Sequence, residues 1–596
     1  MLHTYNPKWD LTSIFEGGSE SEELADYVDR AEVKLKELNA KIDAFHPPER
    51  ETDSAGLEEV LYAIQQVAKM SREFGAYVSC LTAQDVNDKK AGEWLARRSR
   101  LGAAYGNAWT KLDEKLALIP ASVWSGLLEK PTLSRFAFVL NEHRRRANDK
   151  LPLTQEELIN DLSVDGYHAW GHMYNNIVGK MKIEFAGEEL SVGQAHNKTS
   201  SPDRNVRKEV SNKLKKAWEE QSDLFSETLN HLGGFRLQTY AHRGWGSILK
   251  EPLDINRMSE NTLDTMWKTI TKYKNIYKSY LERKAEMLGL EQLDMYDINA
   301  PIGETEQTMT YEAGARFITE QFREFSPKMA EFAEMAFEKR WIEAEDRPGK
   351  RPGGFCTSFP DSRQTRIFMT YSGTASNVAT LAHELGHAYH QHVMNDMPVL
   401  NQGYAMNVAE TASTFAEMIV ADAAVKNAAS EEEKLILLED KIQRSVAFFM
   451  NIHARFLFEK RFYEERRNGV VPAHRLNQLM LEAQQEAYSE SLNEYDPYFW
   501  ASKLHFHITG VPFYNFPYTF GYLFSLGIYK KAVEEGPGFE AKYIALLQDT
   551  GRMCVEDLAR KHLGVELEEP EFWEDAMEMC SADVKDFLEL TKVRSN

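Results

Sequence analysis

The chain has 596 residues, 43% of them hydrophobic and 27% charged, which is long enough for several lobes and ordinary for a globular protein. Its 92 acidic and 70 basic residues give a net charge of -22, which argues against nucleic acid or an anionic membrane as the main partner. No apolar run approaches the roughly 18 residues of a membrane span, and the first residues do not resemble a signal peptide. We therefore expect a cytoplasmic protein.

Helical periodicity dominates the sequence. The clearest amphipathic helices are predicted at residues 22–38, 57–81, 205–243, 262–288 and 432–467. We expect a mainly α, multi-lobed fold whose parts are an N-terminal helical cap (1–115), a small helical lobe (116–200) and a catalytic body (201–596).

One of the few β-like stretches covers residues 363–371, where β-branched and aromatic residues precede Ser372-Gly373. We interpret it as an exposed sheet edge, to which an extended peptide can add as a further strand through main-chain hydrogen bonds. The alternative is an ordinary buried strand.

Residues 383–387 read His-Glu-Leu-Gly-His, and the apolar stripe around them predicts a helix that begins near Ser376 or Asn377. Positions four apart share a helix face, so His383 and His387 can bind one metal ion while Glu384 lies beside it. With one carboxylate ligand this makes a tetrahedral zinc site whose fourth position is open to water, and Glu384 would be the general base. Because a motif of five residues can also occur by chance, the assignment of a metal site depends on a third ligand.

The third ligand must come from another segment, because one straight helix cannot easily wrap His390 around the same ion. A metzincin site is excluded, since the Gly and third His of that class are replaced by His390 and Val393. Residues 402–417 predict a second helix with Glu410 and Glu417 on one side. We predict that Glu410 is the third ligand and that Glu417 orients a ligand histidine through its other ring nitrogen, the alternative for both being a solvated face.

Residues 504–524 hold two histidines and three tyrosines among Gly and Pro, which predicts a loop that leads into a helix begun at Pro517. Tyr518 and Tyr522 would share one face of that helix. Aromatic residues at this spacing belong more often to a core than to a catalytic site. Composition alone therefore assigns them no role.

Taken together, several segments resemble the oligoendopeptidase F family of thimet-oligopeptidase-like zinc metallopeptidases, over essentially the whole chain. They are Trp9 to Phe15, Gly353 to Cys356, Arg366 to Thr374, Leu381 to His390, Asn407 to Glu417 and Pro512 to Tyr522. The resemblance implies one catalytic zinc ion per chain and intracellular cleavage of short peptides. It also implies a helical zincin fold with a small β-sheet beside the active-site helix and a deep channel that excludes folded proteins.

The resemblance also assigns the residues that would support the tetrahedral intermediate. His505 matches the histidine of the family's His-Phe-Tyr pattern, and Tyr514, Tyr518 and Tyr522 match its substrate-facing tyrosines. This chain has a second histidine at position 507, where the family usually has an aromatic residue. Either His505 or His507 could therefore face the substrate, and we favour His505.

Two other functions fit parts of the pattern. A metallocarboxypeptidase that acts at free C-termini would use the same zinc motif in a helical cleft. A non-catalytic peptide-binding protein with a structural metal fits less well, because structural zinc sites usually fill all four positions with protein ligands. We therefore expect a zinc-dependent oligoendopeptidase whose partners are short peptide substrates.

Overall fold

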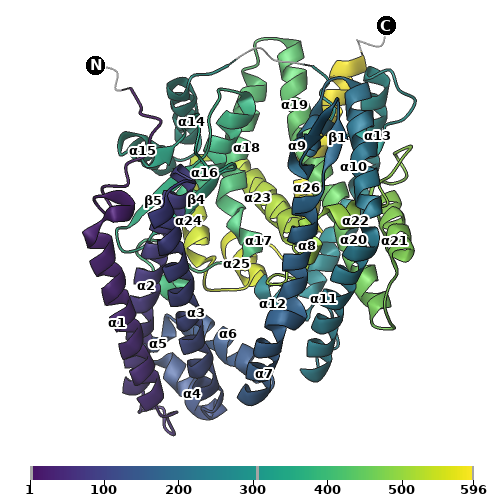
Figure 1. Cartoon of the computed structure of the whole chain (residues 1–596). Coiled ribbons are helices and arrows are strands. Elements are labelled where there is room, and N and C mark those ends of the chain that lie inside the picture. Colours follow the sequence, from purple (N-terminus) through teal and green to yellow (C-terminus); the bar gives the residue numbers. More distant parts are fainter. Residues whose placement is uncertain (1–3, 304–307, 593–596) are drawn as a thin grey trace.

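The computed structural model describes residues 4–303 and 308–592, and helices make up most of it (Figure 1). The predicted mainly α fold with small sheets is confirmed. The first helices are α1 (Glu22–Ala44), α2 (Ala55–Gln84), α3 (Lys89–Ala117), α4 (Ala121–Glu129), α5 (Pro131–Ser134) and α6 (Ala137–Asn148). They enclose a hydrophobic core that runs from Trp9 to Leu140 and includes Phe359 and Phe368 of a distant sheet.

Local capping explains where several of these helices begin. The Ser21 side chain accepts a hydrogen bond from the backbone N–H of Leu24 at the start of α1, and Asp88 does the same for Ala91 in α3. Apolar residues at helical spacing then turn inward, so that one face of α1 is buried from Leu24 to Ile42.

The next helices form one side wall of the molecule in Figure 1. They are α7 (Leu153–Ser163), α8 (Ala169–Lys180), α9 (Val192–Asn197), α10 (Arg204–Glu220), α11 (Ser222–His242), α12 (Lys250–Ile255) and α13 (Glu260–Met287). A hairpin of β1 (Ile183–Phe185) and β2 (Glu188–Leu190) precedes α9. The single helix predicted at 205–243 is two helices, because Gln221 leaves the helical conformation at φ -107° and ψ 3°.

A three-stranded sheet lies between the core of the first helices and the larger core built by the rest of the chain. Its strand order shows that one prediction was wrong. The strands β3 (Ile342–Glu343), β4 (Phe355–Phe359) and β5 (Gln364–Phe368) lie in the order β3-β5-β4. The stretch predicted as an exposed edge is β5, which is central and almost wholly buried, because it pairs in parallel with β3 and antiparallel with β4. Its antiparallel neighbour, β4, lies at an edge of the sheet.

The rest of the chain builds the larger core. Its helices are α14 (Tyr311–Phe325), α15 (Pro327–Glu338), α16 (Ala375–Val393), α17 (Met406–Ala409), α18 (Thr411–Lys426), α19 (Glu431–Val446), α20 (Ile452–Arg466), α21 (Ala473–Ala487), α22 (Phe499–Ser502), α23 (Phe516–Glu535), α24 (Phe539–Asp549), α25 (Val555–Leu563) and α26 (Glu571–Lys592). A π-helical turn, Ala447–Asn451, separates α19 from α20 in the segment predicted as one helix. Helices α16, α18 and α23 lie in the interior of the molecule (Figure 1). Within the described ranges, no helix is both long and apolar enough to cross a bilayer.

Candidate active site

Two close helix contacts bring the predicted site residues together. Gly386, inside the His-Glu-Leu-Gly-His motif on α16, faces α18 so closely that a Cβ atom there would lie 2.4 Å from the carbonyl oxygen of Ala412. At Gly521 on α23, a Cβ atom would lie 2.9 Å from the carbonyl oxygen of Asn407 and 3.3 Å from Cβ of Glu410. Each glycine therefore lets a helix approach the backbone around Glu410.

The predicted metal ligands converge at this contact. The Glu410 Oε2 atom lies 3.2 Å from Nε2 of His383 and 3.4 Å from Nε2 of His387. One donor atom from each of the three residues lies within 4.8 Å of the other two. Two imidazole nitrogens and one carboxylate oxygen are a donor set typical of catalytic zinc sites with an open fourth position, so these residues fit the metal that the sequence implies.

Glu410 occupies a special position in the chain. The predicted continuous helix over 402–417 is broken there, because Glu410 ends α17 and precedes α18 in a non-helical conformation (φ -83°, ψ 1°). Burial alone would raise the pKa of Glu410, but the neighbouring imidazoles of His383 and His387 lower it far below its ordinary value. Ser413 donates a hydrogen bond of 2.7 Å to Glu410 Oε2, which fixes the carboxylate.

Glu417 lies where it can orient a ligand. Its Oε2 atom is 3.2 Å from Nδ1 of His383, and its other oxygen pairs with Arg444 of α19. A carboxylate can only accept here, so Nδ1 of His383 carries the proton and Nε2 keeps its lone pair free for a metal.

Glu384 lies beside the ligands in a different environment. Its side chain is buried, and its Oε2 atom has no hydrogen-bond partner within the described parts of the chain. Burial raises the pKa of Glu384, although the nearby His387 and His383 oppose this effect. A buried carboxylate with an unpaired oxygen next to a metal donor set is the arrangement that a general base requires.

A cavity of about 530 Å³ opens over these residues. His383, Glu384, His387 and Glu410 form one side, and most of β4 lines the other, from Phe355 to Ser358. The helix that carries the histidines is capped by Thr374, whose side chain accepts from the N–H of Asn377, and not by Ser376 or Asn377 as predicted. The Asn377 side chain accepts instead from Ser372, which turns the chain between β5 and α16.

His505, Tyr514 and Tyr518 form an aromatic cluster. The His505 ring centroid lies 5.5 Å from that of Tyr514 and 6.4 Å from that of Tyr518. The loop before α23 is held by the buried carboxylate of Glu459, which accepts from the N–H of Phe513 and the side chain of Asn515. Burial raises the pKa of Tyr518, as do Tyr514 and the charge of Glu410, so Tyr518 stays a hydrogen-bond donor.

The two histidines of this segment differ in environment. Burial, together with the charges of Arg455 and Lys503, lowers the pKa of His505 to about 4, so its imidazole is neutral near pH 7. Arg455 can only donate, and its Nη1 lies 3.5 Å from His505 Nδ1, which leaves the proton on Nε2. His507 is 1% exposed and stacks on Tyr174 with ring centroids 3.9 Å apart. The structure thus keeps His507 inside the core and brings only His505 to the tyrosines.

Tyr522 lies apart from this cluster although it shares a helix with Tyr518. Its hydroxyl is 2.9 Å from Oγ of Ser445, and its ring stacks on Phe448 at 4.6 Å between centroids. The residues that the sequence did not indicate are Ser413, Arg444 and Arg455. Ser413 could have been found three residues after Glu410, whereas the two arginines come from helices with no local link to the motif.

Comparisons with known proteins identify the family of this chain. Residues 198–579 match the model of peptidase family M3, and residues 115–183 match that of oligopeptidase F. The group B oligopeptidase PepB of Streptococcus agalactiae is 24% identical over 91% of this chain and 90% of its own length. The oligoendopeptidase F homolog of Lactococcus lactis subsp. lactis is also 24% identical, over 96% of this chain and 95% of its own.

Solved structures show the same fold. A candidate peptidase from Chlamydophila abortus superimposes with a TM-score of 0.83 at 18% identity and covers 99% of both chains. Oligoendopeptidase F from Enterococcus faecium gives 0.69 at 17% identity and covers 96% of this chain and 99% of its own. The family model spans more than half of the sequence and contains the whole candidate metal site. The chain therefore belongs to peptidase family M3 and is a metalloendopeptidase of the oligoendopeptidase F type.

Proposed function

We propose that the chain hydrolyses internal bonds of short peptides with one zinc ion held by His383, His387 and Glu410. The observation that carries the proposal is the convergence of three ligand atoms within 4.8 Å beside a buried carboxylate, Glu384, with an unpaired oxygen. Two imidazoles and one carboxylate suit zinc better than magnesium or calcium, which prefer oxygen ligands alone.

When bound, zinc supplies Lewis acidity, which makes the scissile carbonyl more electrophilic and a nearby water more acidic. Glu384 accepts the proton of the attacking water and later gives it to the leaving amine. Burial raises its pKa, which makes it a stronger base than an exposed carboxylate and a usable acid in the second step. No covalent intermediate with the enzyme is needed.

Tyr518 and His505 stabilise the negative charge that develops on the carbonyl oxygen. Tyr518 keeps its proton because burial raises its pKa, and His505 presents Nε2–H because Arg455 occupies the neighbourhood of Nδ1. Tyr514 packs against both and keeps them in place. Tyr522 supports the cluster from the core side, through Ser445 and Phe448.

The outer edge of β4 would hold the peptide. Phe355 to Ser358 line the cavity opposite the metal ligands, and β5 occupies only one side of β4. Main-chain hydrogen bonds to this edge would place a peptide bond over the ligands without selecting particular side chains.

The test uses internally quenched peptides blocked at both ends. We expect the purified protein to cleave them, to lose activity after chelation and to recover it with one equivalent of zinc per chain. Glu384→Gln should bind zinc normally and lose at least about a thousandfold in kcat, within the range for a general base, whereas the exposed Glu432→Gln on α19 should be unaffected. Activity restricted to free C-termini would instead indicate a carboxypeptidase, and full activity in Glu384→Gln would refute the general-base role.

A further inference from the structure

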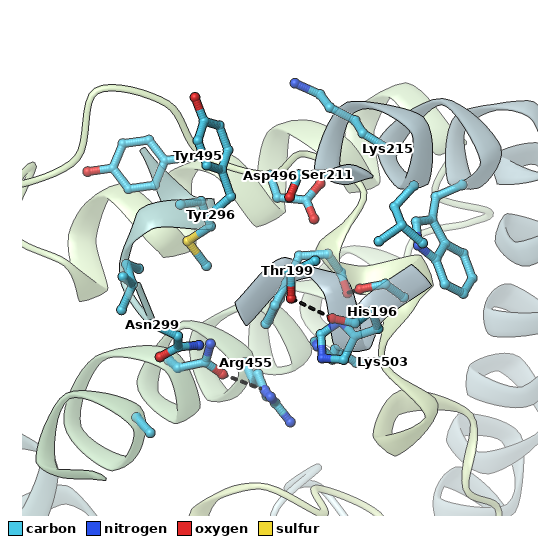
Figure 2. Close-up of a pocket in the computed structure, with 18 of the residues that line it drawn as sticks. His196, Thr199, Ser211, Lys215, Tyr296, Asn299, Arg455, Tyr495, Asp496 and Lys503 are labelled. Atoms are coloured by element: carbon cyan, nitrogen blue, oxygen red, sulfur yellow. Dashed lines mark hydrogen bonds between the residues drawn. The ribbon is translucent and has the colours of Figure 1, made fainter. Parts of the chain in front are cut away.

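A second cavity, of about 630 Å³, is lined in part by Arg455, which contacts His505 (Figure 2). Its walls come from α9, α10, the π-helical turn, α20 and the segment from Glu494 to Lys503. Arg455 and Lys503 lie on one wall, and Figure 2 shows Tyr495, Asp496 and Lys215 on the other side of the view. We call this cavity the cationic pocket.

Neither cation of this wall forms an ion pair with a carboxylate in the part of the chain that the structure describes. Arg455 donates from Nε to Oδ1 of Asn451 at 2.9 Å and also approaches His505 and the Phe499 ring. The ammonium of Lys503 lies 4.5 Å from the centroid of Phe499. Among the residues that the structure describes, no carboxylate oxygen lies within 4.0 Å of either group.

The acidic residues of the pocket form no close ion pair with Arg455 or Lys503 within the described parts of the chain. Glu494 forms an ion pair of 2.8 Å with Lys215. Asp496 accepts a 2.9 Å hydrogen bond from the N–H of Tyr498, and its attraction for Lys503 acts across a longer distance. The wall formed by Arg455 and Lys503 therefore carries two positive charges that Asp496 offsets in part and from a distance, in a chain whose net charge is -22.

Uncompensated buried cations are costly, and two other buried lysines of this protein avoid the cost through ion pairs. Lys441 lies between Asp422 and Asp583, and Lys284 pairs with Glu439. In contrast, burial lowers the pKa of Lys503 to about 8. An isolated charge that is kept out of water is strongly stabilised when an anion binds beside it.

We propose that the cationic pocket binds a carboxylate group of the peptide substrate, with Arg455 and Lys503 as the groups that recognise it. This inference rests on the proposed function, because Arg455 contacts His505 and so joins the pocket to the residues that face the scissile bond. The carboxylate could be the free C-terminus of a short peptide or the side chain of an Asp or Glu. If the pocket binds the C-terminal carboxylate, it also selects substrates by the distance between the scissile bond and the C-terminus.

The test compares matched, internally quenched peptides of one sequence. The first pair ends in a free carboxylate or in an amide. The second set is amidated and carries a single Glu or Gln at each position in turn. We expect kcat/KM to be about tenfold to a hundredfold higher for the peptide with the correctly placed carboxylate, as for a charge-assisted hydrogen bond. The first pair identifies a C-terminal anchor, and the second identifies a side-chain subsite.

Variants then assign the preference to the pocket. Lys503→Met removes an ammonium that makes no ion pair within the described ranges, and it should reduce the ratio of kcat/KM between the carboxylate and amide forms to about threefold or less. Arg455→Lys tests the second group without removing charge and should weaken the preference in part. The matched control is Lys216→Met, which removes an exposed charge from α10 outside the pocket and should keep the full preference. Thermal unfolding verifies that each variant is folded.

The outcomes separate this inference from the proposed function. Equal kcat/KM for the acid and amide forms, and for all Glu and Gln pairs, overturns the carboxylate subsite and leaves the peptidase activity standing. A preference that survives in Lys503→Met with wild-type size also overturns it. If no peptide is cleaved, the proposed function fails, and binding of the same fluorescent peptides to Glu384→Gln by anisotropy decides the subsite by itself.

Discussion

The close approach of α16 and α18 at Gly386 gives the most stringent test of how this site is built. In Gly386→Ala, the new Cβ would lie 2.4 Å from the carbonyl oxygen of Ala412 and 2.6 Å from Cα of Ser413. Both atoms belong to the backbone of α18, so no flexible side chain can move aside. The helices must separate by about 1 Å to restore an ordinary contact.

A shift of this size acts on metal binding more than on folding. Overpacking costs about 1–3 kcal/mol, and the better helix propensity of alanine returns about 0.5–1 kcal/mol. The net loss of unfolding free energy is therefore at most about 2.5 kcal/mol. Metal ligands, however, tolerate errors of only about 0.2 Å, and His383 lies on α16 whereas Glu410 precedes α18. We expect the zinc dissociation constant to rise at least about tenfold.

Zinc affinity is measured by competition with a chromophoric chelator, and stability by thermal unfolding of the metal-free protein. Gly106→Ala on α3 is the control, because a Cβ there meets nothing within 4 Å and should slightly increase stability. If Gly386→Ala binds zinc as tightly as the wild type, the close helix contact does not set the ligand geometry, and our account of the site is wrong.

Three further variants test other parts of the site. Glu417→Gln removes the charge that orients His383, and zinc affinity should fall about tenfold to a hundredfold with little change in stability. Tyr518→Phe removes one donor to the developing oxyanion, and kcat should fall about a hundredfold with KM nearly unchanged. His507→Phe removes a histidine whose pKa burial lowers to about 3. Since the unfolded chain has the higher pKa, it takes up the proton first, and the wild type loses stability as pH falls below about 6.5. That loss is about 2 kcal/mol between pH 7.5 and pH 5, and the variant should lack it.

For each of these variants, one result would contradict the role that we assign to the residue. Normal zinc binding in Glu417→Gln would mean that the His383 ring is held by packing alone. For Tyr518→Phe the control is Tyr62→Phe on the exposed side of α2, and equal kcat in both would remove Tyr518 from the oxyanion site. For His507, the difference in unfolding temperature between the two pH values is compared in wild type and variant, and identical differences would contradict the buried neutral state.

The sequence by itself determined the parts of this protein that depend on neighbours along the chain. His383, Glu384 and His387 lie within five residues, so helix geometry alone places two imidazoles on one face with a carboxylate beside them. Periodicity also predicts Glu410 and Glu417 on one side of the following segment, whereas the packing of α16 against α18 at Gly386 brings Glu410 to the histidines. The helix begun near Pro517 and the mainly helical fold have the same local origin.

Tertiary structure decided the features that depend on contacts between distant segments. The stretch predicted at 363–371 is central because β5 pairs with β3 on one side and with β4 on the other, which leaves β4 at an edge. Tyr518 and Tyr522 are the same residue type, four positions apart on one helix. However, α19 and the π-helical turn cover Tyr522, whereas Tyr518 lies near His505. The cationic pocket, too, exists because α20 brings Arg455 beside Lys503. No pattern along the chain encodes such meetings, because they follow from how whole helices pack and exclude water.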